Sequence, residues 1–381
     1  MKRKIIILLL IILLGGCYNY KELNKIAIVS SISIDKKDDE YLVAAQVLNV
    51  NNKDDSNSSK VIVYEEKGKT IEEALRKMTT KSNKKLYGGH LGKLVISEEV
   101  AKNGIINIID LFQRLPEIKD EFTITISKGI EANKIIKIMT SPETIPADYV
   151  KDTIETADID SALTYSSKLD EFVSFYLKKY IDPVISVVEV KYYDDKGKTL
   201  ENNETTFPKT KIILNNIATT KDGKLDIFLD ENQTIGYNFI RNSINSMIIP
   251  VKCDDKNNSA SISIISSKTK NKVKKDNNDK FIINIYIKTN AMINEYNCSK
   301  DLDKESTIKQ LQKRTENKIK KYIESALSLK TDSEYLGLKR FIYLDYPKYN
   351  NQDFVINVNV DVNISRKGEI RNSSKGEKYE H

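Results

Sequence analysis

The residue whose type and position most clearly imply chemistry in this sequence is Cys17. It follows Leu14-Gly15-Gly16, an aliphatic residue and two small ones, which is the pattern of a bacterial lipobox. In such a site the cysteine thiol takes a diacylglyceryl thioether, and cleavage between Gly16 and Cys17 makes the cysteine the new first residue. Two acyl chains attach a protein stably to a bilayer, whereas a single chain is marginal. The sequence therefore predicts lipidation at Cys17.

Residues 1–16 have the composition of a secretory signal. Three basic residues at 2–4 precede ten consecutive Ile and Leu residues at 5–14. This run is shorter than the roughly 20 residues of a membrane-spanning helix, and it matches the hydrophobic region of a signal peptide. A plain secretory signal with an incidental cysteine and a transmembrane anchor are the alternatives. We expect residues 1–16 to be removed, which leaves the mature protein on the outer face of a cytoplasmic membrane.

Few other residues have the types or spacing of a catalytic or metal-binding site. The sequence has two histidines, His90 and His381, and a nucleophilic triad would have to use His90. His90 has no acidic neighbour, and none of the patterns His-x-x-His, Cys-x-x-Cys and His-Glu-x-x-His occurs. We therefore interpret His90 as a structural residue at a strand edge. We predict no enzyme activity, no metal site and no cofactor.

Two further patterns lack the spacing that their chemistry requires. The segment "GGHLGK" encloses three residues between Gly88 and Gly92, whereas a phosphate-binding Walker loop has four and continues with Lys-Ser/Thr. Adjacent carboxylates at 65–66 and 194–195 fall in polar segments, where we expect them to be solvated. Neither pattern predicts a nucleotide site or an acid–base pair.

Cys253 and Cys298 are the remaining cysteines. After export they could form a disulfide, but spacing alone does not show that their Cα atoms approach each other. A disulfide and two separate, partly buried thiols both remain open.

The composition limits the class of protein. The chain has 381 residues, enough for two or three domains with real cores. Its 61 Lys and Arg residues are interspersed with 54 Asp and Glu residues, so the charge pattern does not imply nucleic-acid binding.

The hydrophobic pattern predicts an N-terminal α+β region over 17–195, formed of one or two domains. Strands are expected at 25–35, 41–50, 91–97, 121–129 and 184–193, and helices from Thr70, at about 98–115, 131–139, 142–151 and 158–180. Ser97 is the expected N-cap of the helix over 98–115, and Pro116 is expected to end that helix.

A polar segment without periodicity, 196–210, is predicted to be a linker. The C-terminal domain over 211–368 is expected to form a sheet of short strands with one long amphipathic helix, and a disordered tail is expected over 369–381. Its last strand alternates apolar residues with Asn and Asp from Phe354 to Ile364, as a half-buried strand does. The predicted class is α+β, multidomain, with mixed and antiparallel sheets and packed helices.

The order of these segments resembles the Ger(x)C family, the C-subunit lipoproteins of spore germinant receptors. The resemblance is carried by the lipobox with Tyr18-Asn19-Tyr20-Lys21-Glu22-Leu23, by "LYGGHLGKLVISEEVAKNGIINIIDLFQRLPEIKDEFTITISKG" at 86–129, and by "DSEYLGL" and "VNVDVNISRKGEI" near the end. Two departures are Tyr18-Asn19 in place of Trp-Asp and Ser33 in place of Gly, and 215–250 matches poorly.

The resemblance implies a three-domain α+β protein held outside the inner membrane of a developing spore. It would be a non-catalytic subunit that binds the receptor's membrane subunits A and B, and the germinant stays unidentified. A solute-binding lipoprotein of a transporter is the alternative, although such a protein usually has two lobes of alternating strands and helices. An exported enzyme acting on cell-wall or carbohydrate substrates is a third hypothesis, and it would need a convergent polar site.

Overall fold

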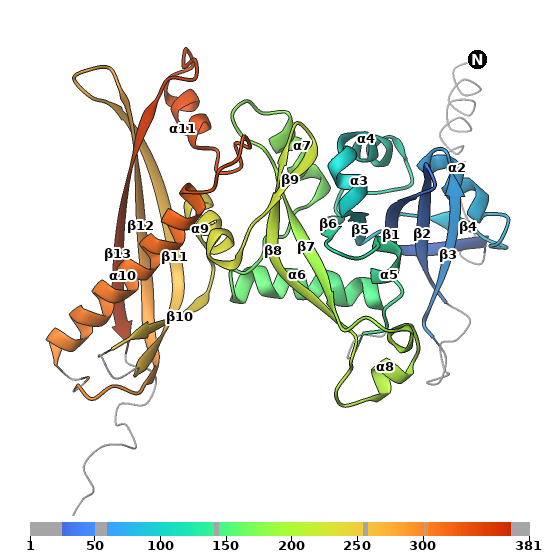
Figure 1. Cartoon of the computed structure of the whole chain (residues 1–381), viewed down its shortest axis with the longest axis horizontal. Coiled ribbons are helices and arrows are strands. Elements are labelled where there is room, and N and C mark those ends of the chain that lie inside the picture. Colours follow the sequence, from blue (N-terminus) through green and yellow to red (C-terminus); the bar gives the residue numbers. More distant parts are fainter. Residues whose placement is uncertain are drawn as a thin grey trace, which may run out of the picture.

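The computed structural model describes residues 25–49, 59–140, 145–253, 258–300, 302 and 304–366. These residues form two β-sheets that follow each other along the long axis of the molecule (Figure 1). Helices pack on both sheets, and the predicted α+β class with mixed and antiparallel sheets is confirmed. The predicted signal, Cys17, the predicted tail and His381 lie outside the described residues.

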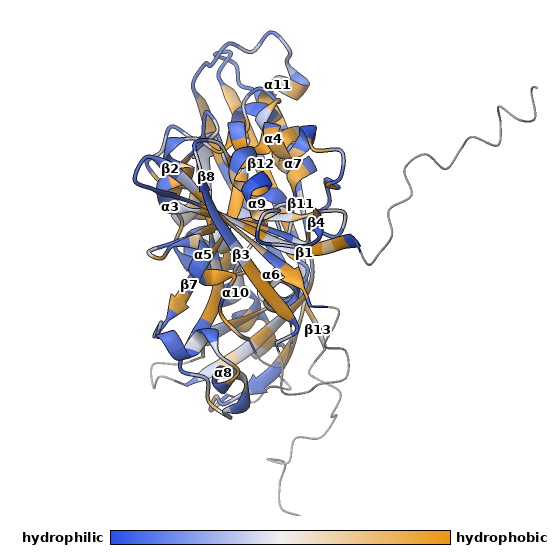
Figure 2. Cartoon of the chain, turned by 90° about the vertical axis from the view of Figure 1, so that its right-hand side faces the viewer, coloured by the Kyte–Doolittle hydropathy of each residue, from blue (hydrophilic) through white to orange (hydrophobic). Residues whose placement is uncertain are grey.

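The larger sheet begins with an antiparallel meander of β1 (Ile26–Lys37), β2 (Glu40–Leu48) and β3 (Val61–Gly68). Asp38 and Asp39 make the turn between β1 and β2 with positive φ angles of 52° and 62°, as a tight hairpin requires. Figure 2 views the molecule from this end and shows the change from hydrophobic to hydrophilic residues along β3, an outer strand of the sheet.

The centre of the larger sheet is parallel. β1 pairs with β5 (Lys93–Ser97), which pairs with β6 (Thr123–Ser127) and then with β7 (Val184–Lys191). All residues of β5 and β6 are buried, as expected for parallel strands that are covered on both faces. The short β4 (Lys85–Tyr87) pairs in parallel with the start of β1.

Helices cover both faces of this sheet. One face packs against α2 (Ile71–Met78), α3 (Glu98–Asn103), α4 (Ile106–Arg114) and α7 (Leu169–Tyr176). The other face packs against α5 (Ala132–Ile135) and α6 (Pro146–Asp160). The first part of the chain is therefore a three-layer unit with the sheet in the middle.

The predicted helix over 98–115 is two helices. Ser97 is its N-cap, as predicted, because the side chain accepts a hydrogen bond from Val100 N. Gly104, with a φ of 144°, separates α3 from α4 in a conformation that other residues rarely adopt. α4 ends at Arg114, before Pro116, as the sequence predicts.

The predicted helix over 158–180 is wrong in its first part. α6 continues to Asp160, and Ala162 then has a φ of 56°, which stops the helix. The following residues run extended beside β6, where Ser167 O accepts a hydrogen bond from Ile124 N. Helical geometry returns only at α7.

The segment 196–210 joins two strands of one sheet. It contains the short helices η3 (Asp195–Lys198, which begins one residue earlier) and α8 (Glu201–Glu204). β8 (Lys211–Lys221) then pairs antiparallel with β7, and β9 (Lys224–Phe228) pairs with β8. The change from the first sheet to the second comes later, after β9, and the division into domains at 196–210 stays a prediction.

The smaller sheet has the order β10 (Met247–Lys252), β11 (Ser259–Lys275), β12 (Phe281–Tyr296) and β13 (Phe354–Arg366). The first three strands are antiparallel, and β13 is parallel to β12. A parallel pair needs a long crossover, which α10 (Glu305–Leu327) and α11 (Leu338–Asp345) supply.

One face of the smaller sheet is covered by α10, α11 and α9 (Glu231–Arg241), and the other is polar. In β13 the residues Val360, Val362 and Ile364 are buried while Asp361 and Asn363 are exposed, so the predicted half-buried strand is confirmed. α9 and α10 lie so close that a Cβ added at Gly236 would be 2.1 Å from Tyr322 O. This contact requires glycine.

Candidate functional site

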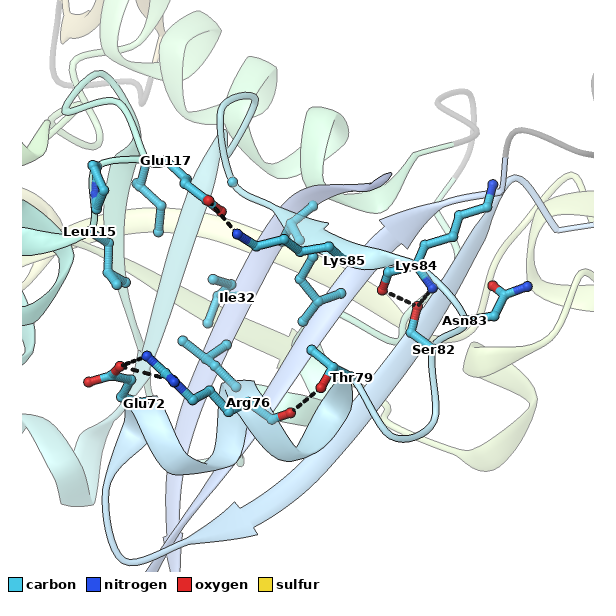
Figure 3. A pocket seen from close by; sticks show the side chains of 16 residues that line it. Ile32, Glu72, Arg76, Thr79, Ser82, Asn83, Lys84, Lys85, Leu115 and Glu117 are labelled. Atoms are coloured by element: carbon cyan, nitrogen blue, oxygen red, sulfur yellow. Dashed lines mark hydrogen bonds and ion pairs between the residues drawn. The ribbon is translucent and has the colours of Figure 1, made fainter. Parts of the chain in front are cut away.

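A groove of about 940 Å³ lies in the larger unit, between α2, β4 and the loop that follows α4 (Figure 3). Three stretches of chain that are distant in sequence line it. Its apolar lining comes from Val29, Ile32, Leu75, Leu86, Leu115, Pro116 and Ile118. The groove is therefore a partly open hydrophobic surface at the beginning of β1.

α2 forms one wall of the groove, and local sequence explains its position. Thr70 caps the helix by accepting a hydrogen bond from Glu73 N at 3.1 Å, and Glu73 accepts one in return from Lys69 N. Ile71 and Ala74 point into the core, so that Leu75 falls on the side of the groove. The amphipathic pattern that predicts this helix thus also supplies the wall.

Ion pairs lie on the rim. Arg76 pairs with Glu72 at 2.9 Å, and Lys85 pairs with Glu117 at 2.6 Å across the groove's two sides (Figure 3). Each pair is partly exposed and adds little to stability. Together they give the groove a rim of both charge signs around an apolar floor.

The hydroxyl groups of the lining are engaged with the backbone. Thr79 Oγ1 donates to Arg76 O at 2.6 Å, and Ser82 Oγ donates to Lys84 O at 2.9 Å. The carboxylates of the rim are held in the ion pairs. This arrangement is suited to holding an apolar or amphipathic surface rather than to moving a proton.

Gly88 shapes the groove through packing. A Cβ at this position would lie 2.6 Å from Ile118 Cγ1, so glycine lets the loop before β5 approach the loop before β6. His90, which follows, is exposed in that loop and does not line the groove. Lys93, the last residue of "GGHLGK", is buried in β5.

The adjacent carboxylates have separate partners. Glu65 pairs with Lys137 and Glu66 pairs with Lys81. Asp194 and Asp195 are divided in the same way, because the first caps η3 through Gly197 N and the second pairs with Lys198. Glu65 and Glu66 lie on β3 rather than in a loop. In the described part of the chain, no three His, Cys, Asp or Glu residues are placed to hold a metal ion.

The structure joins Cys253 and Cys298 in a disulfide, with 5.8 Å between their Cα atoms. The bond connects Cys253, the first residue after β10, to Cys298, the second residue after β12. Of the two possibilities that the sequence leaves open, a disulfide and two separate thiols, the structure has the disulfide.

The predicted lipidation site Cys17 lies outside the described residues. Within the part of the chain that is described, no helix is both long and apolar enough to cross a membrane. Sequence reasoning missed the groove and the burial of Lys93. The only signals for the groove were the apolar stripe of α2 and the Pro-Glu-Ile segment at 116–118.

Two family models match the chain in order. The model "Spore germination protein N-terminal domain" matches residues 19–190, and "Spore germination B3/ GerAC like, C-terminal" matches residues 215–368. These matches define the chain as a spore germination protein. It belongs to the Ger(x)C family, which is non-catalytic.

Individual relatives are similar over most of their length. The chain is 25% identical to spore germination protein KC of Bacillus subtilis over 356 residues, which cover 90% of this chain and 87% of that protein. It is 23% identical to spore germination protein GerQC of Bacillus cereus, over 97% and 99% of the two chains. The crystal structure of the GerBC protein has the same fold, with a TM-score of 0.50, 17% identity and coverage of 88% and 96%.

Proposed function

We propose that this chain is the lipid-anchored C subunit of a spore nutrient-germinant receptor, and that it triggers germination by binding membrane subunits A and B. Membership in the Ger(x)C family supports the receptor role, and the relatives are named as spore germination proteins. The lipobox at Cys17 supports the anchor. The proposed location is the outer face of the spore's inner membrane.

The position of the groove is the observation that carries this proposal. Ile26, the first residue of β1, pairs with Lys85 on the groove's wall. Eight residues lie between Cys17 and Ile26, and the nine steps from one Cα atom to the next span at most about 30 Å when fully extended. A lipid on Cys17 would therefore hold the groove within about that distance of the bilayer surface.

The groove suits one kind of contact with a membrane subunit. An amphipathic segment could place apolar side chains against Leu75 and Ile118 while its polar side meets the charged rim. Because the anchor keeps both proteins in one membrane, their effective concentration is high and a weak contact is sufficient.

The test is the rate of nutrient germination in a strain whose other germinant receptors are deleted. Loss of this gene should abolish the response, and Cys17→Ala should weaken it. Leu75→Glu should weaken it as well, because a carboxylate would enter the apolar lining of the groove. Leu344→Glu makes the same change at a 60% exposed position on α11 and should leave germination unchanged.

Immunoblots establish that each variant is present at the wild-type level. Normal germination without the gene would contradict the receptor role. Normal germination with Leu75→Glu would contradict the role of the groove alone. In the first case a solute-induced rise in the protein's melting temperature would support the solute-binding alternative.

A further inference from the structure

Lys93 is a lysine buried in β5. It is only 1% exposed, and its Nζ makes no hydrogen bond with the part of the chain that the structure describes. Buried lysines are rare unless paired, because the interior does not replace the hydration of an ammonium group.

The surroundings of Lys93 on the sheet are polar but uncharged. Ser31 of β1 and Thr123 of β6 flank it in register on the same face. Ser33 and Thr125 follow on this face, and the hydroxyl groups of Ser31, Ser33 and Thr125 are also buried, with no hydrogen-bond partner among the described residues. These side chains would bind water if the face were opened.

α6 covers this face (Figure 1) with a small apolar contact. Within the described side chains of its 15 residues, only Val150 and Ile154 are buried apolar residues. They belong to an apolar cluster that includes Val95, the residue two positions after Lys93, and Ile212 and Leu214 of β8. α6 therefore covers the polar residues around Lys93 with few buried apolar side chains of its own, which limits the hydrophobic stabilisation of its position.

The other end of α6 belongs to the second unit. Ile159 O accepts a hydrogen bond from Ser246 N at 3.0 Å, just before β10. Ala162, which follows the helix, is part of the core that the smaller sheet forms with α9 and α10. α6 is thus attached to both units.

Among the described residues, the charges that act on Lys93 lie on α6. Burial lowers the pKa of Lys93 well below its usual range, and Glu155 offsets only part of this effect. Lys151 lowers the pKa further and Asp152 raises it, while the neighbouring residues of β1 and β6 are serine and threonine. The closed arrangement therefore favours an uncharged amine, and water favours the ammonium form.

We propose that α6 is a releasable connection between the two units, and that its N-terminal half can leave the sheet and expose Lys93 and the hydroxyl groups around it to water. On exposure, the amine takes up one proton from water. Opening changes the attachment of the first unit to the second. This inference does not depend on the proposed receptor role.

Hydrogen exchange of the full-length protein in detergent tests the opening. After correction for intrinsic exchange, the opening constant of the α6 amides from Tyr149 to Asp158 should fall as pH rises from 6.5 to 8.5, by up to tenfold per pH unit. Lys93→Met should increase protection and remove the pH dependence. The control variant Lys151→Met, on α6 itself, should retain the pH dependence of the opening constant. An unchanged pH dependence in Lys93→Met, or none in the wild type, would overturn the proposal.

Amine labelling of the wild type gives a second readout that needs no folded variant. If Lys93 reacts only through a proton-coupled opening, its labelling rate is nearly independent of pH, since the open fraction falls as the neutral amine fraction rises. An exposed lysine such as Lys102 should react about tenfold faster per pH unit over the same range. A tenfold rise for Lys93 would mean that it stays charged beneath α6, and would overturn the proposal.

Discussion

Asp182 and Glu334 bind each other's backbone across the junction of the two units. Glu334 N donates to Asp182 Oδ2 at 2.7 Å, and Asp182 N donates to Glu334 O at 3.3 Å. Asp182 precedes β7, whereas Glu334 lies between α10 and α11. Their pairing joins two segments that are more than 150 positions apart.

Asp182→Ala should destabilise this junction. The substitution leaves Glu334 N without its acceptor and removes the ion pair with Lys221 at 3.5 Å. A hydrogen bond to a charged group contributes about 1.5–3 kcal/mol, and we expect a loss in that range in urea unfolding. Asp120→Ala, at an exposed position, is the control and should change stability by less than about 0.5 kcal/mol. Equal stability of the two variants would contradict the role of the junction.

The disulfide should stabilise the second unit. It closes a loop with a sequence separation of 45, and removing such a bond typically costs about 2–4 kcal/mol. The double variant Cys253→Ala and Cys298→Ala should therefore unfold at lower urea than the oxidised wild type. Dithiothreitol should lower the urea concentration at which the wild type unfolds toward that of the variant, and it should leave the value for the variant unchanged. A wild type that does not respond to the reductant would argue against the bond.

Gly88→Ala should distort the groove. Its Cβ would meet Ile118 at 2.6 Å, and forced overpacking of this kind costs about 1–3 kcal/mol. Gly92→Ala is the matched control, because its Cβ would lie 3.6 Å from the nearest atom, Ser30 O, which is ordinary contact. In thermal unfolding, Gly88→Ala should therefore have a lower melting temperature than Gly92→Ala. If both lose the same stability, the approach at Gly88 is not tight.

Asp35 should make stability depend on pH. Burial raises its pKa to about 6, even though the carboxylate accepts hydrogen bonds from Ala132 N and Asn133 N. The folded state therefore binds this proton more tightly than the unfolded state does. The stabilisation is complete below about pH 4 and is lost as pH rises through 6.

A comparison of the wild type with Asp35→Asn isolates this contribution. The stability of the wild type relative to the variant should fall by about 2 kcal/mol between pH 4.5 and pH 7, as measured by urea unfolding. Burial also raises the pKa of Asp158 to about 6, but this group is common to both proteins and cancels in the difference. A difference that rises with pH would show that the hydrogen bonds from α5 outweigh burial.

Several elements could be predicted because their signals are local. The alternation from Phe354 to Ile364 predicts a strand with one wet face, and β13 has that face. Ser97 and Pro116 mark the two ends of a helical region, because capping and the geometry before proline involve neighbouring residues. Gly104 is equally local, but a glycine inside a helical pattern does not by itself show a break.

Pairing between distant residues could not be predicted in the same way. The polar segment 196–210 has the composition of a linker, yet β7 and β8 on either side of it pair in one sheet. The groove combines residues from β1, α2, β4 and the loop at 115–118, and no local pattern relates them.

By itself, the sequence determined the candidate anchor at Cys17, the residues able to form strands and helices, and the order of segments that resembles the Ger(x)C family. Periodicity, caps and a lipobox all act over a few neighbouring residues. Tertiary structure alone decided that Lys93 is covered by α6, that Cys253 meets Cys298, and that Leu75 and Ile118 line the same groove. Burial and proximity depend on which distant segments pack together, and composition along the chain does not specify that packing.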